Sequence, residues 1–288
     1  MKGTSEHSRT AEGMALLRAI EQFRHESDRI LDDPHAADFL HHPVAKSIGK
    51  SRLLASLYSL WFSQFAPGAQ ATLVTRARLA DDLASELAQR GLKQIVILGA
   101  GFDLMAARRR YELQDVAIFE MDHPATQAIK RGVISDWAPG NLMMIPVNFE
   151  HEDFTEKLFE HGFDPDAKTL FSWLGVTYYL TQPAIEKTFG LLAGICKPDT
   201  HLVFDYLLAS VLDGTIQEKA ALRHARFVAR LGEPWFWGMS PDQLSAFLSR
   251  FNFRLVTDYD AVKLRNLYRH ERPLMDYVRI AHCVSQSL

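Results

Sequence analysis

The feature that most constrains the fold is a short apolar run that ends in two glycines. Residues 95–98 read Ile-Val-Ile-Leu, Gly99, Ala100 and Gly101 follow directly, and Asp103 stands two residues later. A short run rich in β-branched residues predicts a buried strand. The glycines then allow a sharp turn and let a ligand approach the backbone closely.

A second apolar run, residues 116–122, ends in two acids. Glu120 and Asp122 differ by two positions, so on a strand both side chains point to the same face. Strand, glycine turn, helix, strand and terminal acid form a βαβ unit that binds an adenosine-bearing ligand, with the acid on the ribose hydroxyls. Because Gly-x-Gly alone is weakly diagnostic, a structural turn with incidental acids remains the alternative.

The turn fits S-adenosylmethionine better than a dinucleotide. The dinucleotide fingerprint Gly-x-Gly-x-x-Gly needs a third glycine, and Leu104 occupies that position. The turn also lacks the Gly-Lys-Ser/Thr that cradles phosphates. S-adenosylmethionine carries no pyrophosphate, so it needs neither feature.

Composition excludes several classes of function. An apolar fraction of 47% and a net charge of −3 are typical of a soluble enzyme and give no electrostatic footprint for nucleic acid. Cys196 and Cys283 are far apart, and no histidines stand at metal-ligand spacing, so no metal is expected. The chain starts without the apolar core of a signal peptide, and no apolar run approaches the ~18 residues that span a membrane. We expect a cytoplasmic protein that involves no membrane.

The order of predicted elements indicates an α/β protein. Helical periodicity dominates residues 10–90, with helices at 10–30, from Asp33-Pro34, at 51–65 and at 70–90. Strands and helices then alternate, which predicts a mainly parallel sheet covered on both faces. We expect residues 1–90 to be a helical N-terminal extension and residues 91–288 the core. The expected strands are 94–98, 115–121, 142–147, 168–174, 201–207, 252–258 and 277–284.

Residues 208–239 form a long insertion between the fifth strand and the next helix. The insertion ends in the aromatic stretch 235–237, and we expect it to act as a lid over an acceptor pocket. Trp235 and Trp237 are therefore the candidate substrate-binding residues, although the aromatics could simply seal the lid.

Several segments, taken in this order, resemble the leucine carboxyl methyltransferase-like enzymes, and especially a bacterial branch of O-methyltransferases linked to natural-product pathways. The resemblance implies a class I methyltransferase (Rossmann-like) sheet of seven strands, the last antiparallel, with extra N-terminal helices and a lid. It also implies S-adenosyl-L-methionine as the cofactor. The matching segments are 17–21, 33–36, 75–78 with 81–82, 94–103, 119–124 with Lys130, 173–181 and 232–234.

The resemblance assigns the cofactor's methionyl end to the first half of the chain. Arg76 would grip the carboxylate of the methionyl tail with two parallel bonds, and Arg18 would assist from the first helix on the substrate side. Gly99, Ala100 and Gly101 would lie against the methionyl end. Asp103 would accept a bond from the amino group or cap the following helix.

The adenosine end is assigned to the next two strands. Asp122 would bind the ribose, while Glu120 would hold the loop or share the ribose. Asn148, followed by Phe149, would read the adenine amino group, because an amide both donates and accepts hydrogen bonds. A plain turn asparagine is the alternative at that position.

The fourth strand departs from the family pattern. Leu174 stands where the family often has a glutamate before Gly-Val, which weakens any polar contact to the methionyl tail there. Tyr178 and Tyr179 are the candidate catalytic residues, because an aromatic face or hydroxyl stabilises a sulfonium charge. They could equally be core aromatics.

The function that follows is O-methylation of a small-molecule acceptor, in secondary metabolism, by a monomer or homodimer. A carboxylate acceptor is slightly favoured over a hydroxyl, because the sequence presents no evident base and a carboxylic acid is already ionised at pH 7. The alternatives are a protein C-terminal carboxyl methyltransferase, a nicotinamide-dependent oxidoreductase and a cofactor-binding protein without catalysis.

Overall fold

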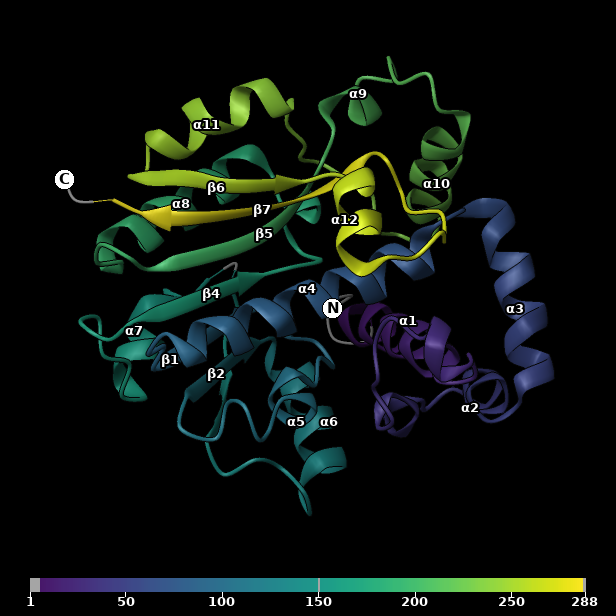
Figure 1. Cartoon of the computed structure of the whole chain (residues 1–288), viewed down its shortest axis with the longest axis horizontal. Coiled ribbons are helices and arrows are strands. Elements are labelled where there is room, and N and C mark those ends of the chain that lie inside the picture. The colour runs from purple at the N-terminus through teal and green to yellow at the C-terminus, as the bar shows by residue number, and fades with distance from the viewer. Residues whose placement is uncertain (1–5, 150, 287–288) are drawn as a thin grey trace. The chain divides into compact units, whose positions relative to one another are not determined.

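The computed structural model describes residues 6–149 and 151–286, and its centre is one sheet (Figure 1). The sheet has seven strands in the order β3-β2-β1-β4-β5-β7-β6. The strands are β1 Gln94–Leu98, β2 Ala117–Asp122, β3 Leu142–Pro146, β4 Thr169–Trp173, β5 His201–Leu207, β6 Phe253–Tyr259 and β7 Val278–Ser285.

The predicted strands are all present, with ends within two residues of those expected. β1 pairs with β2, β2 with β3, and β4 with β5, all in parallel. β7 runs antiparallel to both β5 and β6. The expectation of a mostly parallel seven-stranded sheet with an antiparallel last strand is therefore confirmed. Every residue of β1 and β4 is buried, which explains why the sequence of each strand is mainly apolar and could be recognised as a strand.

The helices agree less closely with the sequence. The first helix ends at Glu21, and the second is a short 3₁₀ helix. A helix that was not expected begins at Pro43, where the His42 side chain accepts a hydrogen bond from the Val44 amide. The last helix in the chain, α12, was also not predicted. The helices are α1 Glu6–Glu21, α2 Pro43–Lys50, α3 Arg52–Phe65, α4 Ala69–Gln89, α5 Met105–Arg108, α6 Pro124–Ile134, α7 Phe154–Glu160, α8 Gln182–Ile195, α9 Ala209–Leu212, α10 Lys219–Arg230, α11 Pro241–Ser249 and α12 Ala261–Tyr268, with 3₁₀ helices η1 Glu26–Asp28, η2 Ala36–Phe39 and η3 Thr177–Tyr179.

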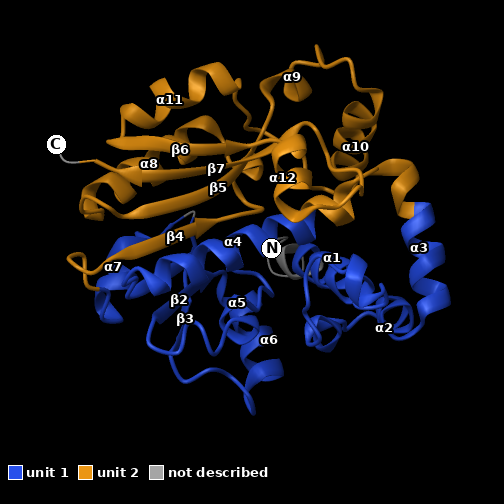
Figure 2. Ribbon diagram, in the orientation of Figure 1, with its two compact units in different colours: residues 1–61, 73–163 blue, residues 62–72, 164–288 orange. Residues whose placement is uncertain are grey.

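The chain divides into two compact units (Figure 2). Unit 1 contains residues 1–61 and 73–163, and unit 2 contains residues 62–72 and 164–288. Helices α1 and α2 and most of α3 and α4 thus belong to the same unit as β1, β2 and β3, so this division does not follow the expected boundary at residue 90. No helix among the described residues is long and apolar enough to cross a membrane.

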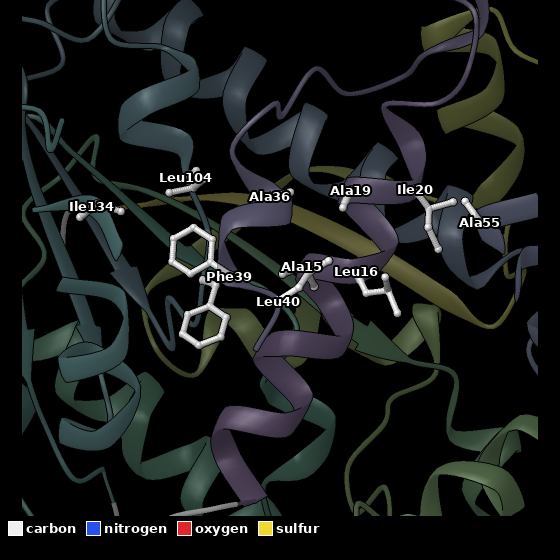
Figure 3. Close-up of a cluster of buried hydrophobic side chains, with 11 residues drawn as sticks. Ala15, Leu16, Ala19, Ile20, Ala36, Phe39, Leu40, Ala55, Leu104 and Ile134 are labelled. Carbon is white, nitrogen blue, oxygen red and sulfur yellow. The ribbon is translucent and has the colours of Figure 1, made fainter. Parts of the chain in front are cut away.

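The core of unit 1 joins the N-terminal helices to the glycine turn (Figure 3). Side chains of α1 and η2 pack against Leu104 and Ile134 in one buried cluster. Phe39 of η2 stacks on Phe102, which lies directly after the turn, with ring centroids 4.9 Å apart. The first helices therefore support the turn by hydrophobic contact. Burial of apolar surface contributes roughly 25 cal/mol per Å² to stability.

Candidate functional site

The turn after β1 has the geometry that its glycines predict. Gly99 has φ 71° and Gly101 has φ 52°, a region that strongly favours glycine. The Gly99 and Ala100 amides both donate to the Met121 carbonyl, at 2.8 and 3.1 Å. The turn is therefore fastened to the end of β2, the strand that carries the two acids.

Asp122 lies at the rim of this turn. Its two carboxylate oxygens accept from the Gly101 and His123 amides, each at 2.6 Å, while the residue stays half-buried. A carboxylate has about four acceptor positions, so these two bonds leave capacity for two hydroxyls. Asp122 is thus oriented as a ribose-binding acid would need to be.

Asp103 binds the start of the helix that follows the turn and joins an ion-pair network. Its Oδ1 accepts from the Met105 amide at 2.7 Å, and Arg108 approaches its carboxylate at 3.2 Å. Burial alone would raise the pKa of Asp103, but the positive charges of Arg108, Arg18 and Lys130 outweigh burial and lower that pKa to about 2. The carboxylate is therefore firmly ionised and binds the first amide of α5, although the N-cap residue itself is Leu104.

Arg108 is the centre of the network beneath the turn. Its buried guanidinium binds Asp81 through two nitrogens at 2.7 and 2.9 Å, and it also pairs with Asp33 at 3.1 Å. Burial tends to lower the pKa of Arg108, but Asp103, Asp81 and Asp33 together raise it. The carboxylates come from segments far apart in sequence, so a single arginine connects the N-terminal extension, α4 and the turn.

Two further buried cations bind consecutive carbonyls of the turn. Arg18 pairs with Asp33 at 2.9 Å and donates to the Phe102 carbonyl at 2.6 Å. Lys130 of α6 donates to the Asp103 carbonyl. These bonds fix the backbone of residues 102 and 103 from behind. Arg18, expected on the substrate side, is almost fully buried here, and its contacts are those of a residue that positions the turn.

Glu120 holds the structure rather than facing a ligand. It is fully buried, and its carboxylate pairs with Lys130 at 2.5 Å. Burial raises the pKa of Glu120, and the Lys130 ammonium opposes that rise. Of the two roles expected for Glu120, this contact corresponds to holding the loop, because a fully buried carboxylate does not present itself to a ribose.

The other candidate cofactor-binding residues of unit 1 are Arg76, Asn148 and Phe149. Arg76 is half-buried on α4. Asn148 follows β3, where its backbone N–H donates to the Glu152 carboxylate at 2.7 Å. Phe149 is partly exposed and packs on Phe154, with ring centroids 6.1 Å apart. Their roles toward a cofactor stay predictions.

In unit 2, aromatic side chains gather where β4 and β5 end. Tyr178 and Tyr179 lie on η3, shortly after β4, with ring centroids 4.8 Å apart. Trp235 packs edge-on against Tyr178 at 6.0 Å, and the Tyr178 carbonyl accepts from the Phe236 amide at 2.8 Å. The structure thus brings together a predicted catalytic tyrosine and a predicted substrate-binding tryptophan. Ligands in open α/β sheets bind at this end of the parallel strands.

Trp237 differs from its neighbour Trp235. It is 2% exposed, its indole nitrogen donates to the Gln182 side chain at 2.7 Å, and its ring packs against Phe247 of α11. These are the contacts of a core residue, so the substrate-binding role expected for Trp237 finds no support in its surroundings. The Trp235 indole nitrogen is buried and donates to no described protein atom.

The turn after β4 obtains its polar contacts from a neighbouring strand. Leu174, the departure from the family pattern, is half-buried and offers no polar group. Asp205 of β5 accepts from the Gly175 amide at 2.9 Å, and its own carbonyl accepts from the Thr177 hydroxyl. An acid is therefore present beside this turn, but it comes from β5 and holds the turn in place.

A histidine and a tyrosine pair within the same aromatic cluster. His224 of α10 lies 2.7 Å from the Tyr277 hydroxyl through its Nδ1, and Trp235 packs edge-on against the imidazole at 5.0 Å. Burial lowers the pKa of His224 to about 4 and raises that of Tyr277. At pH 7 the imidazole is therefore neutral, and its low pKa makes it a hydrogen-bond partner rather than a strong proton acceptor.

Comparison with known proteins identifies the family. The sequence profile of the leucine carboxyl methyltransferase family matches residues 11–193. The chain belongs to this family. A Bacillus subtilis (strain 168) protein, YktD, named as a candidate S-adenosyl-L-methionine-dependent methyltransferase, is 33% identical over 147 residues, covering 50% of this chain and 48% of YktD. A Mycobacterium avium (strain 104) protein of the same designation is 27% identical over 205 residues, covering 69% of this chain and 65% of that protein. The chain thus spans about half to two thirds of the length of these relatives.

Solved structures share the fold. A DUF574 family protein from Streptomyces avermitilis aligns with TM-score 0.61 at 11% identity, covering 94% of this chain and 97% of that one. A candidate methyltransferase from Thermobifida fusca aligns with TM-score 0.60 at 14% identity, covering 81% and 89%. At such low identity these likenesses concern the fold alone, and they agree with the class I methyltransferase sheet expected from the sequence.

Within this leucine carboxyl methyltransferase family member, sequence reasoning missed the roles of several residues. It did not connect Asp33, Asp81, Lys130 and Arg108 in a common network around the turn. His224 was read as an ordinary histidine. No group of three or more potential metal ligands is found among residues 6–149 and 151–286.

Proposed function

We propose that the protein is an S-adenosyl-L-methionine-dependent O-methyltransferase that acts on a small-molecule acceptor in secondary metabolism. Family membership supports the reaction class. The observation that carries the cofactor assignment is the geometry around Asp122: a half-buried carboxylate is held by the Gly101 amide at the rim of a left-handed glycine turn. This arrangement offers acceptors to ribose hydroxyls and open backbone to a methionyl tail, and provides no phosphate cradle.

The residues of this chain would act mainly by positioning. S-adenosylmethionine supplies a methyl group on a positively charged sulfur. An acceptor oxygen would form a bond to the methyl carbon while the carbon–sulfur bond breaks. The electron pair of the broken carbon–sulfur bond would stay on sulfur. Alignment of the reacting atoms alone is worth up to roughly 7–11 kcal/mol in favourable cases. In unit 1, Asp122 and the turn would hold the adenosine and Arg76 the carboxylate. Tyr178 and Tyr179 of unit 2 stay the candidate catalytic residues because an aromatic face can stabilise a sulfonium charge.

Titration calorimetry tests the cofactor assignment. We expect S-adenosylmethionine and S-adenosylhomocysteine to bind and NAD to show no heat. Asp122→Asn keeps the size of the side chain but removes its charge, and should weaken both sulfur ligands. Binding of NAD alone would refute the proposal in favour of the oxidoreductase.

The acceptor class depends on the His224–Tyr277 pair. A carboxylate acceptor, slightly favoured from the sequence, needs no base, whereas a phenol with pKa near ~10 needs one. His224 lies beside Trp235 in the predicted lid and can accept a hydrogen bond from an acceptor hydroxyl, although its pKa of about 4 makes it a weak base; a hydroxyl acceptor is therefore the second candidate. A general base typically contributes about 10²–10⁴-fold in rate.

Incubation of the protein with labelled cofactor and a panel of carboxylic acids and phenols, read by mass spectrometry, tests both candidates. For a carboxylate acceptor, turnover of His224→Gln should equal that of the wild type. For a hydroxyl acceptor, His224→Gln should reduce kcat and leave cofactor affinity unchanged. Absence of any methylated product, with intact cofactor binding, would instead indicate a cofactor-binding protein without catalysis.

A further inference from the structure

Helices α2 and α3 carry large apolar side chains on their outer surface. α2 leads almost directly into α3, with only Ser51 between them (Figure 1). We call the exposed side chains of residues 44–61 the α2–α3 surface. Its most exposed members are Val44 at 59%, Leu53 at 69%, Leu57 at 55%, Leu60 at 64% and Trp61 at 50%.

The exposed residues of α3 form one stripe. Leu53, Leu57, Leu60 and Trp61 follow the spacing i, i+4, i+7, i+8, which places them on a single helix face. Ala55, on another face, is buried in the core cluster of Figure 3. The helix thus has an inner face that contributes to this core cluster and an outer face that is apolar. Contiguous apolar patches of this kind mark interaction sites.

A shallow hollow lies between the two helices. Its volume is about 510 Å³, and its lining is almost entirely apolar. Val44 and Leu57, both more than half exposed, make it an open surface rather than a closed pocket for a small molecule. The lining residues are Pro43, Val44, Ser47, Ile48, Leu54, Leu57, Tyr58 and Trp61.

The segment that contains the α2–α3 surface is positively charged, whereas the whole chain carries a net charge of −3. Residues 39–80 contain five of the 32 lysines and arginines and none of the 35 aspartates and glutamates. Three of these five, Lys46, Lys50 and Arg52, are exposed on or beside α2 and at the start of α3. One acid approaches from α1, but the Glu12 carboxylate accepts from the His41 and His42 amides, each at 2.7 Å. An apolar stripe is thus bordered by positive charge.

We propose that the α2–α3 surface binds the surface of an anionic lipid bilayer. Apolar side chains of an amphipathic helix enter the boundary between headgroups and acyl chains, and basic side chains at its border attract anionic headgroups. α3 has 14 residues, fewer than the ~20 needed to span a bilayer, so it would lie in the plane of the interface. This departs from the expectation that no membrane is involved, which rested on the absence of a spanning run.

A second copy of the chain fits this surface less well. In a two-fold symmetric dimer the same patch meets itself, so the basic border of one copy would face that of the other. Lys46, Lys50 and Arg52 would then repel their equivalents, with no acid in residues 39–80 to neutralise them. Charge complementarity therefore favours an anionic lipid over self-association.

Flotation with extruded vesicles tests the proposal. The wild-type protein should float with vesicles of equal parts phosphatidylglycerol and phosphatidylcholine, and much less with phosphatidylcholine alone or at high salt. Leu57→Glu should reduce the floated fraction on the order of tenfold, because it places an anion in the apolar stripe. The matched control is Leu267→Glu on α12, whose leucine is 51% exposed and lies outside the surface. This control should float like the wild type.

A second measurement needs no charged substitution in the stripe. Brominated acyl chains should quench part of the tryptophan fluorescence, and Trp61→Phe should abolish that part. Failure of the wild-type protein to float, or equal flotation of Leu57→Glu and Leu267→Glu, would overturn the proposal. So would a dimer in light scattering that Leu57→Glu dissociates while no variant binds vesicles. Melting temperature and S-adenosylhomocysteine affinity show whether each variant is folded.

Discussion

Replacement of Arg108 by leucine should destabilise the protein far more than replacement of an exposed arginine. The Arg108 side chain is 4% exposed and is shared by Asp33, Asp81 and Asp103. Leucine removes the cation and leaves those carboxylates near one another. Arg18 still pairs with Asp33, and Arg109 still approaches Asp81 at 3.8 Å, but the two short bonds that Arg108 makes to Asp81 are lost.

The magnitude follows from the cost of breaking a buried ion pair. Removal of one partner typically costs 3–5 kcal/mol, because the other charge stays buried without compensation. At about 2.1 cal/mol/K per residue, unfolding of 288 residues carries an entropy of about 0.6 kcal/mol/K, so the melting temperature should fall by about 5–8 °C. Arg108→Lys keeps the charge but cannot form the bidentate bond to Asp81, and should lie between leucine and wild type.

Thermal and urea unfolding of the variants, together with calorimetry of S-adenosylhomocysteine, provide the assay. The matched control is Arg90→Leu, since Arg90 pairs with Glu86 at 2.7 Å but its side chain is 70% exposed. Exposed pairs contribute about 0–1 kcal/mol, so this control should melt within about 2 °C of the wild type. If Arg108→Leu and Arg90→Leu melt alike, the network beneath the turn does not stabilise the fold and our reasoning is wrong.

Three further predictions concern the cofactor, pH and metals. Arg76→Ala should weaken S-adenosylmethionine binding by roughly 1.5–3 kcal/mol in calorimetry. Arg78→Ala should not weaken it, because Arg78 pairs with Asp82. Equal losses of affinity in the two variants would place the carboxylate clamp elsewhere. Burial lowers the pKa values of His224 and His282 to about 4, below the ~6.5 of the unfolded chain, so the unfolded state binds more protons below pH 6.5. Urea unfolding should show stability lost as pH falls from about 6.5 to 4, by up to about 3 kcal/mol per histidine, and His224→Gln should flatten that slope. EDTA should leave methyl transfer unchanged; activity restored by one divalent ion would contradict this.

The sheet was predictable because its strands are buried runs of apolar residues separated by clear turn signals. β1 reads directly as Ile-Val-Ile-Leu, and the glycines at its end have the conformation that only glycine adopts readily. Such signals are local, so they survive without knowledge of the fold. The short helices were harder to predict, since η2 has four residues and α12 has eight, and neither contains enough turns for a periodic pattern.

The network beneath the turn could not be read from the sequence, because its members are brought together only by folding. Arg108 stands in a run of three arginines that resembles a solvated helix face. Its partners Asp33 and Asp81 precede it by 75 and 27 positions. Local spacing describes contacts along one helix or strand, whereas this contact depends on how α4, α5 and the N-terminal segment pack.

The different roles of the two tryptophans in the stretch 235–237 also could not be predicted from local sequence. Variants of these two residues can separate a role in function from a role in packing. The two tryptophans are alike in sequence, but Trp237 donates to Gln182 within the core, whereas the buried Trp235 nitrogen lies in the cluster with Tyr178 and His224. Trp237→Ala should therefore cost about 3–5 kcal/mol of stability, the usual range for a buried tryptophan. Trp235→Phe keeps an aromatic ring and removes only the nitrogen, so it should melt near the wild type.

With a methyl acceptor in hand, Trp235→Phe should raise KM or lower kcat while leaving cofactor affinity within about threefold, a difference of less than 1 kcal/mol. Such a result would mean that the indole nitrogen binds the acceptor. Unchanged kinetics for Trp235→Phe would remove it from the substrate site. If Trp235→Phe and Trp237→Ala lost stability and both ligands alike, the whole stretch would be core, and the acceptor site would have to lie elsewhere in the chain.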